Sequence, residues 1–244
     1  MKSPKALVIV VLTCLFALQG SSAHGGFGDI LKGLEKVLGG GELSEGKIID
    51  GLKEALEVGT KNAVERVSRL NGYYRDPKIR IPLPDAVRKV EKVLRSVGFG
   101  SQVDAFELSM NRAAERAAPE ARALFWDTIR KMSFDDARKI LSGRDNEATL
   151  YFKEKTWDRL DETFRPIVHQ TMSKVGATRQ YQALDAKMRS IPFADRFAFD
   201  LDQYVSEKAL GGLFTMLAEE ERRIRQDPAA RVTDLLKEVF EGKR

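Results

Sequence analysis

From Ser44 onward the chain repeats one local pattern: a cap residue, apolar positions three or four apart, and a closing glycine or proline. Ser101 with Asp104 and Ser133 with Asp136, each pair three residues apart, have the spacing of a capping box at the start of a run, and Asp227-Pro228 opens the last run. No credible strand separates these runs. We therefore predict an all-α fold, an irregular bundle of about eight helices in a single compact domain. The expected helices cover residues 44–70, 85–97, 101–117, 119–132, 133–143, 146–176 and 177–191, followed by two that begin at 200 and 228.

Two segments of the predicted domain stand apart from the others. Tyr73 to Pro84 is rich in proline, which lacks an N–H donor and biases its predecessor toward extended geometry. Its apolar residues alternate with polar ones, so we expect a short extended strap that lies across the helices and has one apolar face. Leu201 to Leu217 is apolar nearly all round, which indicates a buried central helix. Its charged continuation, Glu219 to Arg225, should emerge into water.

The first residues predict export. Met1 to Lys5 is positively charged, Ala6 to Leu18 is an apolar run, and a small-residue exit ends at Ala23. The run has thirteen residues, whereas a spanning helix needs roughly 20, so we favour a cleaved signal peptide over residues 1–23 and no transmembrane anchor after cleavage. A lipoprotein is the less favoured alternative, since Thr13 rather than a small residue precedes Cys14.

We therefore expect a periplasmic protein with three parts. A signal peptide over 1–23 is followed by a glycine-rich N-terminal arm with a short helix over 24–43, and the helical domain covers 44–241.

Composition excludes several classes of function for the cleaved chain. Cys14 is the one cysteine, so its removal rules out disulfides, thiolate zinc sites and cysteine nucleophiles. Removing Lys2 and Lys5 from the 41 basic residues leaves 39 against 36 acidic ones, a net charge of +3. The two signs are interspersed, which argues against a nucleic-acid partner. We expect no cofactor and no metal.

Several short motifs resemble a known family. They are Leu43-Ser44-Glu45-Gly46, Gly51-Leu52-Lys53-Glu54-Ala55-Leu56, Arg80-Ile81-Pro82-Leu83-Pro84, Met110-Asn111-Arg112-Ala113-Ala114-Glu115, Leu210-Gly211-Gly212-Leu213-Phe214 and Ala218-Glu219-Glu220-Glu221. Their order is similar to that in bacterial exported proteins catalogued as domain of unknown function 4197, and the resemblance covers about Leu43 to Phe240. It implies a helical envelope protein of Gram-negative bacteria. It implies no activity, substrate or catalytic residue.

One polar stripe is a candidate site. Asp104, Glu107, Asn111 and Glu115 are three or four residues apart and share a helix face, with Arg112 beside them. Two carboxylates flanking an amide could bind a cation or act as an acid/base pair. The plainer alternative is a solvated helix face.

Lys208 is the second candidate, because it lies in the most apolar part of the chain. A buried ammonium is costly unless it is paired, so we expect Lys208 to be buried against a carboxylate, for which Glu115 is the best candidate. Two alternatives stay open: an anion-binding or proton-handling site, and a side chain that reaches the surface. His169 is the only histidine of the predicted domain, and one histidine makes no metal site.

These observations favour a non-enzymatic, soluble binding or scaffold protein for an apolar ligand or an envelope partner. The alternative is a carboxylate-dependent hydrolase of an envelope polymer that uses Glu107 or Glu115 as its acid. A cleft discriminates between them: a pocket at Glu115 favours the enzyme, and an apolar one favours binding.

Overall fold

The computed structural model describes residues 45–174 and 200–226, and within these ranges the chain is all-α, without a strand. Its elements are α2 (Glu45–Ser68), α3 (Asp85–Ser96), α4 (Gly100–Ala117), the 3-10 helix η1 (Ala118–Glu120), α5 (Ala121–Arg130), α6 (Phe134–Ser142), α7 (Glu147–Lys174) and α9 (Leu201–Gln226). The described residues thus hold seven α-helices and one short 3-10 helix, against about eight helices expected for the whole domain. The helices expected over 177–191 and from 228, the signal peptide and the glycine-rich arm all lie outside the described residues.

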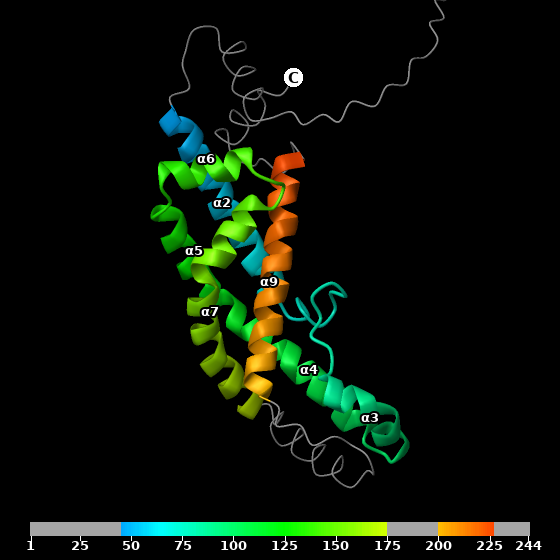
Figure 1. Ribbon diagram of the computed structural model, residues 1–244. Coiled ribbons are helices and arrows are strands. Elements are labelled where there is room, and N and C mark those ends of the chain that lie inside the picture. Colours follow the sequence, from blue (N-terminus) through cyan, green and yellow to red (C-terminus); the bar gives the residue numbers. More distant parts are fainter. Residues whose placement is uncertain (1–44, 175–199, 227–244) are drawn as a thin grey trace, which may run out of the picture.

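The core forms around α9, which packs against α2, α4 and α7 (Figure 1). Val205, Ala209, Leu210, Leu213 and Met216 are fully buried on its inner side. Helix α6 crosses one end of this bundle, while α3 packs mainly on α4 at the other end. The predicted central position of the 200–226 helix is therefore confirmed.

Local signals set some helix ends and not others. At the start of α6 the Ser133 hydroxyl accepts a hydrogen bond from the Asp136 N–H at 3.1 Å, and the Asp136 carboxylate accepts one from the Ser133 N–H at 3.1 Å. The same box was expected at Ser101 and Asp104, but α4 begins at Gly100 and Asp104 binds Arg95 instead. An ion pair with α3 thus takes the carboxylate that a local cap would have used.

Residues 71–84 connect α2 to α3 and lie against α4 and α9. The chain turns at Asn71, whose φ of 68° is left-handed, and then passes through hydrogen-bonded turns as far as Arg80. Ile79, Ile81 and Leu83 are all buried. This segment carries most of the polar contacts of the candidate residues.

Candidate functional site

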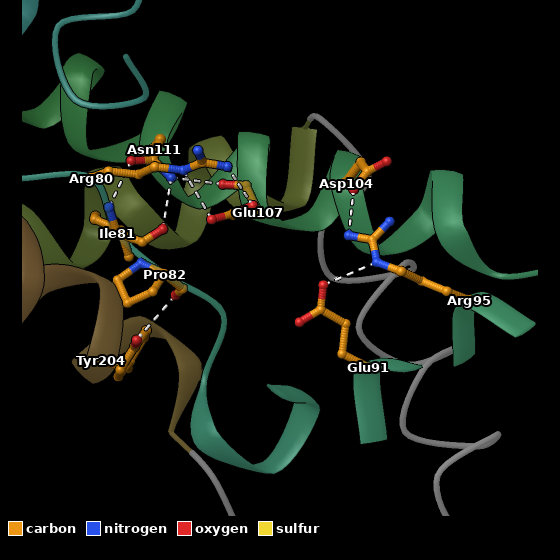
Figure 2. A network of polar contacts seen from close by, with 9 residues as sticks. All are labelled: Arg80, Ile81, Pro82, Glu91, Arg95, Asp104, Glu107, Asn111 and Tyr204. Atoms are coloured by element: carbon orange, nitrogen blue, oxygen red, sulfur yellow. Dashed lines mark hydrogen bonds and ion pairs between the residues drawn. The ribbon is translucent and has the colours of Figure 1, made fainter. Parts of the chain in front are cut away.

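Asn111 is fully buried on α4 and fixes the backbone of Ile81 (Figure 2). Its side-chain Oδ1 accepts a hydrogen bond from the Ile81 N–H at 2.8 Å, and its Nδ2 donates to the Ile81 carbonyl at 2.9 Å. The same Nδ2 also donates to the Glu107 carbonyl at 2.9 Å. The amide therefore makes the two hydrogen bonds that a neighbouring strand would make to Ile81. It pairs the N–H and the carbonyl of a residue that lies outside any helix.

Glu107 holds the next residue of the same segment. The Arg80 guanidinium donates from Nε to Oε1 at 3.0 Å and from Nη2 to Oε2 at 2.7 Å, a bidentate pair. The guanidinium also lies 4.5 Å from the centre of the Tyr74 ring. Both Glu107 oxygens are thus engaged by one cation of the chain itself.

Glu115 is buried, with 5% of its surface exposed, and it is fully committed to the fold. Its Oε1 accepts from the N–H groups of Tyr73 at 3.2 Å and Tyr74 at 3.4 Å. Its Oε2 accepts from Arg112 Nη1 at 2.5 Å, and Arg112 Nη2 donates to Asn71 Oδ1 at 2.8 Å. The carboxylate and the guanidinium together stabilise the left-handed turn at Asn71.

Tyr73 anchors the segment to α9. Its hydroxyl donates to the Ala209 carbonyl at 2.7 Å, and its ring is fully buried. Burial, together with the nearby Glu115 carboxylate, raises the pKa of the Tyr73 phenol well above its usual range. A Cβ at Gly212 would lie 2.6 Å from the ring, so glycine is required there for close approach.

Apart from Asp104, which pairs with Arg95 of α3, the candidate stripe therefore binds the chain's own 71–84 segment. Glu107, Asn111, Arg112 and Glu115 all come together in the structure, but their hydrogen-bonding groups point at this segment. This arrangement gives no geometric support to an acid/base pair, and the hydrolase stays a prediction without a site.

Lys208 does not join this group, and the expected pairing with Glu115 is wrong. Its side chain is exposed on α9, with Nζ 5.7 Å from the centre of the Tyr204 ring, while Glu115 pairs with Arg112. The reason is the angular position of Lys208 around the axis of α9. Lys208, Gly211 and Thr215 lie on one exposed strip, although their neighbours in sequence are buried.

His169 also lies at the surface. Its Nδ1 is 2.7 Å from the Asp202 carboxylate, which joins α7 to the first turn of α9. Within residues 45–174 and 200–226, no three metal-ligating side chains come together in a group that could hold an ion.

Sequence reasoning missed a buried carboxylate at the end of α9. The run Glu219 to Arg225 was expected to emerge into water, yet Glu220 and Glu221 are both buried. Glu221 accepts hydrogen bonds from the N–H groups of Ala148 at 2.9 Å and Thr149 at 2.8 Å, at the N-terminus of α7. It also binds Arg225, which in turn donates to the Ile140 carbonyl at 2.9 Å. The motif Glu219-Glu220-Glu221 looked like a solvated helix end because the backbone groups that Glu221 binds lie over seventy positions away in the sequence.

Beside this pair lies an apolar crevice among α2, α6, α7 and α9. It is narrow, with a cavity volume of about 30 Å³, and only two of its lining side chains, Glu221 and Arg225, are charged. Across it, Ala55 and Ile224 form a small apolar cluster separate from the main core. The crevice is therefore a place where the packing of the bundle is interrupted. Its apolar lining comes from Leu52, Ala55, Leu56, Gly59, Ile140, Leu141, Ala148, Phe152, Leu217 and Ile224.

The fold and this crevice define an all-helical domain with an apolar opening at one end of its bundle. The chain belongs to the family described as protein of unknown function (DUF4197), whose model matches residues 42–241. The resemblance noted in the sequence motifs is thereby confirmed. Comparison with curated proteins and with solved structures gave no match. Among the described helices, none is both long enough and apolar enough to cross a membrane.

Proposed function

We propose that this protein is a non-enzymatic binding protein of the bacterial envelope that takes an apolar ligand in the crevice among α2, α6, α7 and α9. The observation that carries the proposal is the lining of the crevice. Its side chains are apolar except for a carboxylate and a guanidinium that already bind each other, a composition typical of ligand pockets.

The chemistry of the lining favours an uncharged, apolar group. Leu52, Leu56 and Phe152 are buried residues of α2 and α7 that border the crevice, and none of them offers a hydrogen bond. Glu221 and Arg225 satisfy backbone groups of α7 and α6, so their main role is to hold the walls in place. The affinity for a ligand should therefore come from burial of apolar surface.

The test is binding of N-phenyl-1-naphthylamine, an uncharged dye that fluoresces in apolar surroundings. Leu141→Trp places a large ring at a partly buried position of the crevice and should abolish or strongly weaken dye binding. Leu124→Trp is the matched control, because Leu124 is also partly buried against the core but does not line the crevice. Equal dye binding by both variants and wild type would remove the crevice from consideration.

The location in the periplasm is part of the same proposal, supported by the charged start, the apolar run and the small-residue exit of residues 1–23. Protein recovered from the producing cell should begin at His24 and fractionate with periplasmic markers. Native mass spectrometry of that material should show a retained apolar ligand. A chain that keeps Met1 and stays with cytoplasmic markers contradicts this location.

A further inference from the structure

A second cavity lies between α6 and the first turns of α7, two helices that pack against each other in Figure 1. Its volume is about 310 Å³, at the lower end of the range for small-molecule sites. Of its lining residues, Ile140 alone also lines the apolar crevice, so the two are distinct sites. In contrast to the crevice, most of this lining is charged: Asp136, Lys139, Arg144, Glu147, Glu154 and Lys155.

Helical spacing brings these charged side chains to one place. On α6, Lys139 lies three positions after Asp136, and on α7 Tyr151 and Lys155 lie four and eight positions after Glu147. Residues at such spacings share one face of a helix. The cavity is therefore enclosed by one face of α6 and one face of α7, with the connection between the two helices at its end.

The carboxylates of the cavity already have donors from the chain. Oδ2 of Asp136 accepts a hydrogen bond from the Ser133 N–H at 3.1 Å, as part of the cap of α6. Oε2 of Glu147 accepts from the Arg144 N–H at 3.3 Å and from its Nε at 3.1 Å. The third carboxylate, on Glu154, accepts from the ammonium of the following residue at 3.2 Å. A cationic ligand would have to compete with all these donors.

The cations of the cavity, by contrast, have donors to spare. Lys139 is exposed and, within residues 45–174 and 200–226, its ammonium makes no hydrogen bond or ion pair. Arg144 uses its N–H and Nε, so both of its terminal Nη groups are available on the same described part of the chain. Lys155 spends one of its three N–H donors on its neighbour. Unused charged donors around a cavity suit a ligand group with several anionic oxygens.

We propose that the cavity between α6 and α7 binds the phosphate group of a small molecule through Lys139, Arg144 and Lys155. A phosphate monoester offers three terminal acceptor oxygens, and the guanidinium fork matches two of them. The uncharged part of the ligand packs on the apolar lining, which includes Ile140 and Tyr151. The three cations and three carboxylates of the lining cancel, so hydrogen bonds rather than net charge provide the recognition. This inference does not depend on the proposed apolar ligand.

Titration of the isotope-labelled protein with glycerol 3-phosphate, followed by amide NMR at constant ionic strength, tests the site. Lys139→Gln and Arg144→Gln should each weaken binding about tenfold or more, because each removes a hydrogen bond between charged groups. Lys153→Gln is the matched control, since Lys153 is an exposed lysine of α7 that does not line the cavity. It should leave the affinity unchanged, and glycerol itself should not bind. An equal loss in all three variants overturns the proposal.

A second probe distinguishes a soluble phosphate ester from a lipid headgroup. Phosphatidylcholine vesicles containing phosphatidic acid present the same phosphate monoester on a membrane. Vesicle binding that is lost in Lys139→Gln but kept in Lys153→Gln, without binding of glycerol 3-phosphate, supports the site and assigns its phosphate to a lipid. Binding of glycerol 3-phosphate with the same dependence, without vesicle binding, supports a soluble ligand. If neither probe shows binding that depends on Lys139, the proposal is wrong.

The dye experiment keeps this inference separate from the proposed function. Lys139 does not line the apolar crevice, so Lys139→Gln should bind N-phenyl-1-naphthylamine as wild type does. Loss of dye binding in this variant would contradict the independence of the two sites. Absence of dye binding in wild type, together with phosphate binding that depends on Lys139, supports the phosphate site and contradicts the proposed apolar ligand.

Discussion

The carboxylate of Glu221 caps the N-terminus of α7 through Thr149: its Oε2 accepts hydrogen bonds from both the Thr149 N–H and the Thr149 hydroxyl, each at 2.8 Å. A helix N-terminus has orphan N–H donors and a partial positive charge, and here a residue of another helix satisfies them. The same carboxylate binds Arg225, which reaches the end of α6. One buried ion pair on α9 therefore joins three helices around the crevice.

Removal of this carboxylate should be costly. Glu221→Ala leaves the Arg225 guanidinium without its main partner and exposes the donors of α7, so we expect a loss of about 3–5 kcal/mol of unfolding free energy. Urea denaturation measures it. Glu162→Ala removes an exposed carboxylate of α7 and should change stability by less than about 0.5 kcal/mol. Similar losses in both variants would show that Glu221 has no special role.

The adjacent glycines of α9 should respond to alanine in opposite directions. A Cβ at Gly211 meets nothing within 4 Å, so Gly211→Ala should stabilise the helix by about 0.5–1 kcal/mol. A Cβ at Gly212 lies 2.6 Å from the Tyr73 ring, so Gly212→Ala should destabilise the protein by about 1–3 kcal/mol. Thermal melting of the two variants gives the signs, and a shift in the same direction for both contradicts the packing of Tyr73 on α9.

Asn111 should be required for the attachment of residues 71–84. Asn111→Leu keeps the approximate volume but leaves the N–H and the carbonyl of Ile81 buried without partners, which should cost about 2–4 kcal/mol. Ile81→Asp, which places a charge at a position with 1% exposure, should cost more than about 2 kcal/mol. Chemical denaturation tests both, and unchanged midpoints would show that the segment contributes little to the fold.

The cap of α6 predicts a dependence of stability on pH. Hydrogen bonds from Ser133 hold the pKa of the Asp136 carboxyl below its usual value of 3.8, chiefly through the hydroxyl. A group whose folded pKa is depressed contributes stability above its unfolded pKa, and the contribution disappears as the pH falls through the folded pKa. Ser133→Ala should therefore cost about 1 kcal/mol at pH ~7, and the difference from wild type should narrow below about pH 4.

The control for this experiment is Ser101→Ala. Ser101 was expected to cap α4, but α4 begins at Gly100 and no side chain caps it. Its replacement should leave the urea midpoint unchanged across the same pH range. A loss at Ser133→Ala that does not vary with pH would show that the Asp136 carboxylate is not involved.

The sequence predicts those features of the fold that depend on residues close together in the chain. The Ser133 box, the all-α class and the buried face of α9 follow from signals within a few turns of helix. The roles of Asn111 and Glu115 do not, because their partners, Ile81 and Tyr73, lie 30 and 42 positions earlier. A polar stripe on one helix indicates only that its side chains need partners, and an acid/base site, a solvated face and an attached loop all satisfy that need.

The burial of Glu221 and Lys208 could not be predicted from the sequence either, and the two errors have opposite signs. The sequence placed Glu221 in water because its neighbours are charged, and it placed Lys208 in the core because its neighbours are apolar. In both cases the angular position on α9, and the elements that pack there, decided the burial. Neither the angular position nor the identity of the packed elements can be obtained from the composition of a short stretch of sequence.

Lys208 and Arg112 give the last prediction, since the structure reverses their expected importance. Lys208 is exposed, and its ammonium lies near the Tyr204 ring, so Lys208→Met should stay within about 0.5 kcal/mol of wild type. Arg112 is the partner of the buried Glu115 carboxylate and also binds Asn71. Arg112→Met should therefore cost about 3–5 kcal/mol, because it leaves a buried carboxylate with only backbone donors. Denaturation of both variants decides the matter, and the double variant Arg112→Met with Glu115→Gln should recover part of the loss. A neutral Arg112→Met together with a destabilised Lys208→Met would restore the pairing first expected from the sequence.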